Sequence, residues 1–143
     1  MALLLFAPVL VQATAMLADE GWCHRRRGLP LWEKVGHPID TLTTAFCYAW
    51  LSFVRPGAPH ALPVYVGLAL FSSLFITKDE FVHARLCGPL ETWLHSVLFV
   101  MHPIVLACFG VAWLTGVSSW AFQVQLFITL AFASYQVLYW SRA

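Results

Sequence analysis

Two stretches of the chain carry the same acidic and histidine side chains in nearly the same order. Each stretch holds an acid pair, a histidine, a Pro-Leu pair, a glutamate and, four residues later, a second histidine. In the first stretch the acids and histidines are Asp19, Glu20, His24, Glu33 and His37. In the second stretch they are Asp79, Glu80, His83, Glu91 and His95. Carboxylates and imidazoles beside apolar segments cost free energy unless something pairs them, so the repetition predicts a metal site built from two similar halves.

The spacing of these residues would bring each acid beside a histidine. Residues four apart lie on one face of an α-helix, and Glu20/His24, Glu33/His37, Asp79/His83 and Glu91/His95 all have that spacing. Each pair offers one carboxylate oxygen and one imidazole nitrogen to a single point. The predicted ligands are therefore Glu20, His24, Glu33, His37, Asp79, Glu80, His83, Glu91 and His95, with the choice between Asp79 and Glu80 left open.

Further polar residues could orient these ligands from behind. Asp19, Asp40, His102 and Cys23 are predicted to lie in this outer layer. His102 could instead replace His95, because His37-Pro38 is matched by His102-Pro103 and seven residues separate the two histidines. Seven residues are two helical turns, so both histidines would lie on one face, and the sequence does not decide between them.

This ligand pattern resembles that of the di-iron and di-manganese carboxylate proteins, in which glutamates and Glu-x-x-His motifs project into a four-helix bundle. The resemblance covers only the motif residues, and the chain offers more histidine than those proteins use. It implies two metal ions. Mixed carboxylate and imidazole ligands suit iron, manganese or zinc, and iron is the expected metal.

The composition places the chain in the membrane. Of its 143 residues 60% are hydrophobic and only 10% are charged, whereas about 25% are charged in a typical soluble domain. The net charge of +1 gives no reason to expect a nucleic-acid partner. The four cysteines show no CxxC spacing, and Cys47 and Cys108 in apolar runs are interpreted as buried hydrophobic residues.

Apolar segments occupy residues 1–18, 39–54, 62–77, 92–114 and 117–140. A helix needs about 20 residues to cross a bilayer. The second and third segments reach that length only if one helix begins near Trp32 and the other continues through His83. The first segment lacks a basic leading region, so we interpret it as a retained helix rather than a signal peptide.

Basic residues indicate the orientation. Five spans would put seven of them on one side of the membrane, namely Arg25, Arg26, Arg27, Lys34, Lys78, Arg85 and Arg142, and Arg55 on the other. The positive-inside rule then predicts a bacterial-type inner membrane protein with its N-terminus outside, its C-terminus cytoplasmic and both motifs at the cytoplasmic face. The run Arg25–Arg27 is expected to fix this topology and to touch anionic lipid.

The predicted fold is an all-α membrane protein forming one transmembrane domain, residues 1–143. Residues 1–58 and 61–116 would be parallel two-helix repeats that together form a transmembrane four-helix bundle, and residues 117–143 would add a fifth transmembrane helix. The sequence leaves the oligomeric state open.

The function expected from this site is oxidation or reduction of an apolar or lipid-like molecule, with membrane lipids and an electron donor as partners. A zinc-dependent membrane hydrolase could use the same ligands. A b-type haem carrier could use His37 with His95 or His102, although it would need none of the carboxylates. A purely structural belt of ion pairs is the remaining alternative. A metal transporter is disfavoured because no acid and only His60 lies in the outer half.

Overall fold

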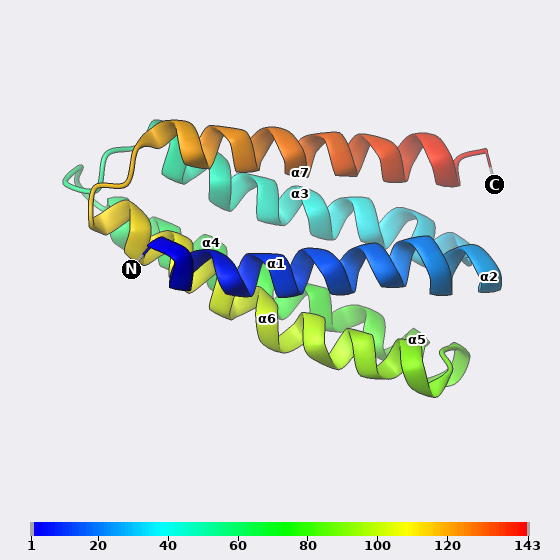
Figure 1. Cartoon of the computed structure of the whole chain (residues 1–143). Coiled ribbons are helices and arrows are strands. Elements are labelled where there is room, and N and C mark those ends of the chain that lie inside the picture. Colours follow the sequence, from blue (N-terminus) through cyan, green and yellow to red (C-terminus); the bar gives the residue numbers. More distant parts are fainter. Residues whose placement is uncertain (1, 143) are drawn as a thin grey trace.

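Long helices running along one common direction make up the protein (Figure 1). The computed structural model describes residues 2–142, and the side chains of residues 7–142. This part of the chain is all helical, as predicted, and contains no strand. Its helices are α1 (Ala2–Ala18), the π-helix η1 (Asp19–His24), α2 (Arg25–Arg27), α3 (Leu31–Phe53), α4 (Ala61–Phe75), the 3-10 turn η2 (Ile76–Asp79), α5 (Glu80–Leu86), α6 (Pro89–Leu114) and α7 (Ser119–Trp140).

The long helices pack in the order α1, α6, α4, α3, α7. Helix α1 lies on α6, α6 on α4, and α3 contacts both α4 and α7. Figure 1 shows the connections at residues 54–60 and 115–118 at one end of the bundle, which we call the loop end. Helices α2 and α5 and the C-terminus lie at the opposite end, called the motif end (residues 19–33 and 79–91). Both acid-histidine stretches therefore reach the same end of the bundle.

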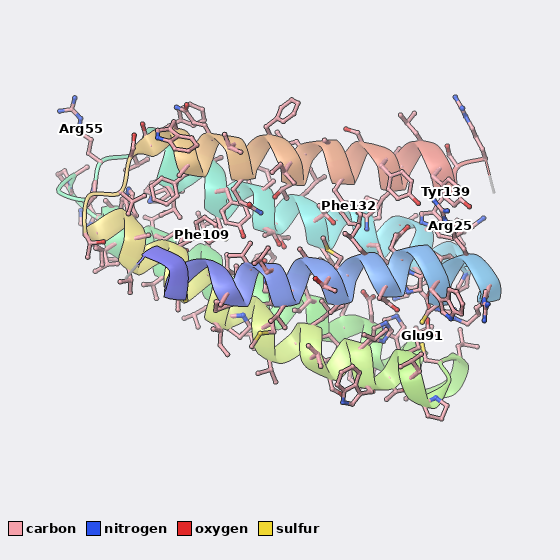
Figure 2. The ribbon with its side chains drawn as sticks, viewed as in Figure 1. Arg25, Arg55, Glu91, Phe109, Phe132 and Tyr139 are labelled. Atoms are coloured by element: carbon pink, nitrogen blue, oxygen red, sulfur yellow. The ribbon has the colours of Figure 1, made fainter. Side chains whose placement is uncertain are left out.

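The apolar core lies at the loop end, where Phe109 and Arg55 are seen in Figure 2. Its buried residues are Cys47, Tyr48, Leu51, Ala61, Tyr65, Val105, Leu106, Phe109, Ala112, Trp113 and Phe122. Helices α4 and α6 approach closely here, since a Cβ on Gly110 would lie 2.7 Å from Cε1 of Tyr65. The Tyr65 hydroxyl donates to the carbonyl of Leu106 at 2.6 Å, which holds its ring against α6.

Short breaks with glycine and proline start the two helices that lead away from the motif end. Gly28 has a φ of +73°, and Pro30 precedes the first residue of α3. Gly88 precedes α6, and Pro89 occupies its first turn, where the missing amide hydrogen costs no bond. Each break is followed within one turn by a glutamate, Glu33 in α3 and Glu91 in α6.

Three helical stretches are long and apolar enough to cross a membrane, namely Ala61–Leu86, Pro89–Leu114 and Ser119–Trp140. The first of them runs continuously through His83, and α3 begins at Leu31, next to the predicted start. Helix α1 has 17 residues, fewer than the usual span, and α3 carries Glu33, Lys34 and Asp40 in its first half. These three helices indicate a membrane protein. The five spans, the bundle built from two repeats, the type of membrane and the orientation remain predictions.

Candidate metal centre

Acidic and histidine side chains from five elements, η1, α3, η2, α5 and α6, meet in the interior of the motif end. At most 6% of each of the following residues is exposed: Asp19, Glu20, His24, Glu33, Asp79, His83, Glu91 and His95. His37 is partly buried and also lies in this group, because its ring centroid is 4.8 Å from that of His24. The ligand pairs predicted from spacing therefore lie together, although Glu80 is only half-buried.

A π-helical turn decides how the first stretch points. Residues 19–24 form η1, which is wider than an α-helical turn, so His24 faces both members of the acid pair. Its Nε2 lies 3.3 Å from Oδ2 of Asp19, and its Nδ1 lies 3.5 Å from Oε2 of Glu20. Asp19, predicted to sit behind the ligands, is thus a direct neighbour of His24. Turns of this kind occur often at functional sites.

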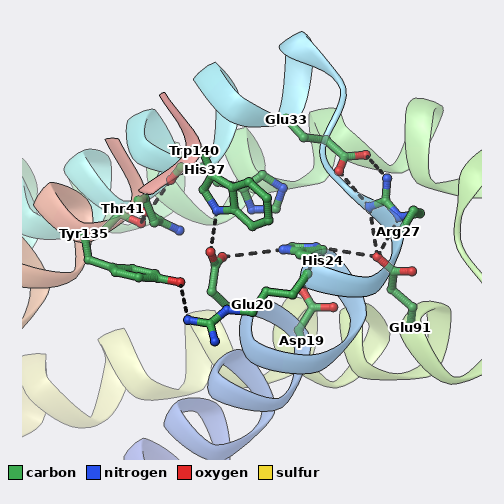
Figure 3. Close-up of polar contacts among 12 residues, drawn as sticks. Asp19, Glu20, His24, Arg27, Glu33, His37, Thr41, Glu91, Tyr135 and Trp140 are labelled. Carbon is green, nitrogen blue, oxygen red and sulfur yellow. Dashed lines mark hydrogen bonds and ion pairs between the residues drawn. The ribbon is translucent and has the colours of Figure 1, made fainter. Parts of the chain in front are cut away.

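Arg27 joins the two stretches (Figure 3). Its guanidinium Nη2 lies 2.7 Å from Oε2 of Glu33 and 2.9 Å from Oε1 of Glu91. The sequence interpretation grouped Arg27 with the lipid-facing arginines, but its side chain is only 18% exposed and points inward. Arg25 instead donates to the hydroxyl of Tyr135 from an exposed position. Both glutamates that begin the returning helices are therefore paired with one cation.

The other carboxylates of the cluster also have partners. Trp140 donates its indole hydrogen to Oε1 of Glu20 at 2.5 Å. Asp79 accepts from Nε1 of Trp32 at 3.1 Å and from Nζ of Lys78 at 3.1 Å. Lys78 also donates to Oδ1 of Asp40 at 2.6 Å, so Asp40 is tied to Lys78 and Asp79. Glu80 forms no hydrogen bond or ion pair within residues 7–142, which favours Asp79 as the inward-facing acid of its pair.

The imidazoles, in contrast, make few hydrogen bonds, although both nitrogens of His24 and Nε2 of His83 lie 3.3–3.6 Å from carboxylate oxygens. Among the described side chains, eight buried polar atoms have no hydrogen-bond partner, and six of them are imidazole nitrogens: Nδ1 and Nε2 of His24, Nε2 of His37, Nδ1 and Nε2 of His83, and Nδ1 of His95. The rings pack against one another, with centroids of His83 and His95 4.1 Å apart. An unsatisfied buried polar group costs about 1–3 kcal/mol. A bound cation would satisfy several of these nitrogens at once.

Three groups of side chains could hold such a cation. They are Asp19, His24, Glu91 and His95; His24, Glu33 and His37; and His83, Cys87 and His95, and within each group the ligand atoms lie within 4.8 Å of one another. Cys87 was not predicted, although its spacing of four from His83 was a usable signal. Arg27 gave no such signal, because nothing in the sequence distinguishes it from its two neighbours.

His102 occupies a different place. Nε2 of Gln12 donates to Nδ1 of His102 at 3.2 Å, and Nε2 of His102 contacts the Ser72 hydroxyl at 3.0 Å. Both ring nitrogens therefore have partners, whereas Nδ1 of His95 has none. Of the two histidines left open by the sequence, His95 is the one gathered with the other ligand candidates. Cys23, also predicted to lie behind the ligands, is half-buried.

The charges around His24 favour its protonated form when no metal is bound. Burial lowers the pKa of His24. The contact with Glu20 and the negative charges of Asp19, Glu20 and Glu91 raise it by more than burial lowers it, so the pKa lies above its ordinary value. Burial raises the pKa of Asp19, yet the hydrogen bond from His95 and the charge of His24 leave it below its usual value. Asp19 is therefore ionised near neutral pH.

A cavity of about 360 Å³ opens beside the centre. Its polar end is formed by Asp19, Glu20, His24, His37, Asp79, His83 and His95. Its walls toward the middle of the bundle include Val9, Ala13 and Met16 of α1, Leu98 and Phe99 of α6, and Ile128 and Phe132 of α7. Ile128, which also lines the cavity, lies halfway along α7 and is 54% exposed.

No protein-family model, curated protein or solved structure matches this chain. The function is therefore argued from the geometry of the site itself.

Proposed function

We propose that this chain is an integral membrane metalloprotein with a dinuclear iron centre at the motif end, and that it oxidises or reduces an apolar molecule. The observation that carries the proposal is the set of six unpartnered imidazole nitrogens. Carboxylates nearby are paired by Arg27, Lys78 and Trp140, so the open groups are those that bind transition metals as neutral nitrogen donors.

Overlap among the three ligand groups supports two ions rather than three. The group of His24, Glu33 and His37 shares no residue with the group of His83, Cys87 and His95. The remaining group takes its two histidines from these two, and a neutral imidazole has only one free lone pair. Two ions would therefore use the available histidines, with Asp19 and Glu91 lying between them as additional oxygen donors.

The cavity supports an apolar substrate. Ligand sites are usually concave, largely apolar and about 300–1,000 Å³ in volume, with a few polar groups at one place. The cavity beside His24 and His95 fits this description, and Ile128 in its apolar wall is also exposed on α7. A bound iron centre would supply redox chemistry, while Ala13, Phe99 and Phe132 would hold the substrate chain and exclude water.

Two alternatives differ in how well they fit. A haem would take His37 with His95 or His102 as axial ligands, but His102 already has two partners and the His95 ring packs against that of His83, with centroids 4.1 Å apart. A zinc-dependent hydrolase remains a second candidate because Asp19 Oδ1 is buried without a partner and could act as a base. Zinc would give a colourless protein, whereas iron would give visible or near-ultraviolet absorption.

Metal analysis of the full chain, purified from native-like membranes, tests the proposal. We expect about two iron ions per chain and loss of most of them in a His24→Ala/His95→Ala double variant. His60→Ala is the matched control, because His60 lies in the loop-end turn far from the cluster in sequence and is exposed. Less than about one ion per chain, or undiminished metal in the double variant, would overturn the metal centre; zinc in place of iron would overturn the oxidoreductase.

A further inference from the structure

One ligand group contains a sulfur atom, which the carboxylate-histidine pattern does not include. Cys87 directly follows α5, and its backbone N–H donates to the carbonyl of His83 at 2.9 Å, which holds it beside the last turn of that helix. His95 reaches the same place from the first turns of α6, and its ligand atom lies within 4.8 Å of those of His83 and Cys87. Only 4% of His83 and 3% of His95 is exposed, while Cys87 is half-buried.

The tautomer of His95 supports this placement. Its Nε2 is 3.0 Å from Oδ2 of Asp19, and an ionised carboxylate can only accept, so Nε2 carries the hydrogen and donates it. The other nitrogen, Nδ1, then carries the lone pair, and it is buried without a partner. A carboxylate behind a histidine is the usual arrangement for fixing the ring of a metal ligand. Asp19 thus orients the His95 ring so that Nδ1 is free to bind a metal ion.

His83 supplies a second nitrogen. Both of its ring nitrogens are buried and unpartnered, and the closest acid, Oε1 of Glu33, is 3.6 Å from Nε2. Glu33 is already held by Arg27, which donates to both of its oxygens. The His83 and His95 rings lie 4.1 Å apart, and three of their four nitrogens have no hydrogen bond, an arrangement that a shared cation would stabilise.

We propose that Cys87 is a metal ligand, and that His83, Cys87 and Nδ1 of His95 hold one ion of the centre. This assignment rests on the proposed function, because it presupposes that the cluster binds metal. On binding, the sulfur–hydrogen bond of Cys87 breaks, a sulfur–metal bond forms and the proton passes to water, with no change of oxidation state. The two ion positions are therefore chemically different, one with sulfur and nitrogen and the other with oxygen and nitrogen donors.

The sulfur ligand bears on which metals fit. Thiolate and imidazole together suit zinc and iron, whereas manganese and magnesium prefer oxygen donors. Manganese, which the carboxylate-histidine pattern alone would allow, is thus disfavoured at this position. His83 and His95 both line the cavity, so an ion held by them would lie beside it.

Cobalt(II) loading of the metal-stripped full-length protein tests the assignment. A cobalt–thiolate bond gives an intense near-ultraviolet charge-transfer band that nitrogen and oxygen ligands do not give. We expect this band in the parent protein, its complete loss in Cys87→Ser, and its retention in the matched control Cys23→Ser, since Cys23 is also half-buried at the motif end but belongs to none of the ligand groups.

The outcomes separate the two proposals. Cobalt that binds without a thiolate band, or with a band unchanged in Cys87→Ser, overturns the role of Cys87 and leaves the metal centre standing. No cobalt binding at all overturns the metal centre itself. If Cys87→Ser does not fold, thiol alkylation of the parent decides: bound zinc should abolish modification of Cys87 while Cys23 still reacts, and equal modification of Cys87 with and without zinc overturns the assignment.

Discussion

A single guanidinium, that of Arg27, bridges Glu33 at the start of α3 and Glu91 at the start of α6. The contacts are 2.7 Å to Glu33 and 2.9 Å to Glu91, and Glu33 is fully buried. Glu33 and Glu91 occupy corresponding places in the two repeated stretches, so one cation pairs with both copies of the same motif residue. The bridge also joins two helices that otherwise contact each other little near this end.

Removing this bridge should destabilise the metal-free protein. Arg27→Met leaves Glu33 and Glu91 without their cation, and breaking a buried ion pair in this way costs about 3–5 kcal/mol. We expect a clearly lower melting temperature in detergent for metal-free Arg27→Met, measured by intrinsic tryptophan fluorescence. Arg26→Met is the control, because Arg26 is exposed and stacks on Trp22. Equal melting temperatures for the two variants would contradict the bridge.

Replacing each of the two histidines of α6, His95 and His102, should affect the metal content differently. His95→Ala removes a nitrogen that has no other partner and should lower the metal content of the purified protein by about half or more. His102→Ala should leave the metal content unchanged, since Gln12 and Ser72 already occupy both of its nitrogens. Elemental analysis of both variants, normalised to protein, checks this. Metal loss in His102→Ala alone would reverse the assignment.

Filling the cavity should block an apolar ligand without disturbing the metal. Ala13→Phe projects a ring into the cavity from α1, whereas Val11→Phe places the same ring on the surface, where Val11 is 48% exposed. Native mass spectrometry of protein incubated with dodecanol should show ligand retained by the parent and by Val11→Phe but lost from Ala13→Phe. Metal content should be the same in all three. Retention by Ala13→Phe would count against this cavity as the substrate site.

Close packing at the loop end makes Gly110 sensitive to any added side chain. The Cβ of Gly110→Ala would lie 2.7 Å from the Tyr65 ring, which its hydrogen bond to Leu106 holds in place. Overpacking of this kind costs about 1–3 kcal/mol. Gly67→Ala is the control on α4, because a Cβ there meets nothing within 4 Å. Denaturation in mixed micelles should separate the two, and similar stabilities would argue against the close approach.

The metal-free protein should also gain stability from His24 in a pH-dependent way. The pKa of His24 is raised above its unfolded value of about 6.5, so its contribution is fully present below that pH and is lost as the pH rises through the folded pKa. The difference in melting temperature between the parent and His24→Gln, both stripped of metal, should shrink as the pH rises above about 6.5 and through the folded pKa. A difference that grows with pH would contradict the raised pKa.

The sequence was enough to predict the helices and the meeting of the two stretches, because both follow from local patterns. Apolar runs interrupted by Gly-Leu-Pro and Gly-Pro fix where helices stop and start, and spacings of four fix which acids and histidines share a face. The start of α3 near Trp32 and the continuation of the third helix through His83 both agree with this reasoning.

Details that depend on contacts between helices could not be predicted. The π-helical turn at residues 19–24 brings Asp19 to His24, and the sequence of that turn does not distinguish it from an ordinary α-helical turn. Arg27 turns inward only because Glu33 and Glu91 meet there. The choice of His95 over His102 depends on Gln12 of α1, which lies far from His102 in the sequence. Each of these outcomes is decided by a partner far away in the sequence.

The separation of the apolar core from the polar cluster has a consequence for how the chain opens. Most large buried apolar side chains lie at the loop end, whereas the motif end is held chiefly by ion pairs and hydrogen bonds. Local opening free energies follow buried apolar packing, so amides around Leu51 and Phe109 should exchange with deuterium far more slowly than those of α2 and α5 in the metal-free state. Metal ions bound at the motif end would close that gap, and the protein would then open as one unit instead of two.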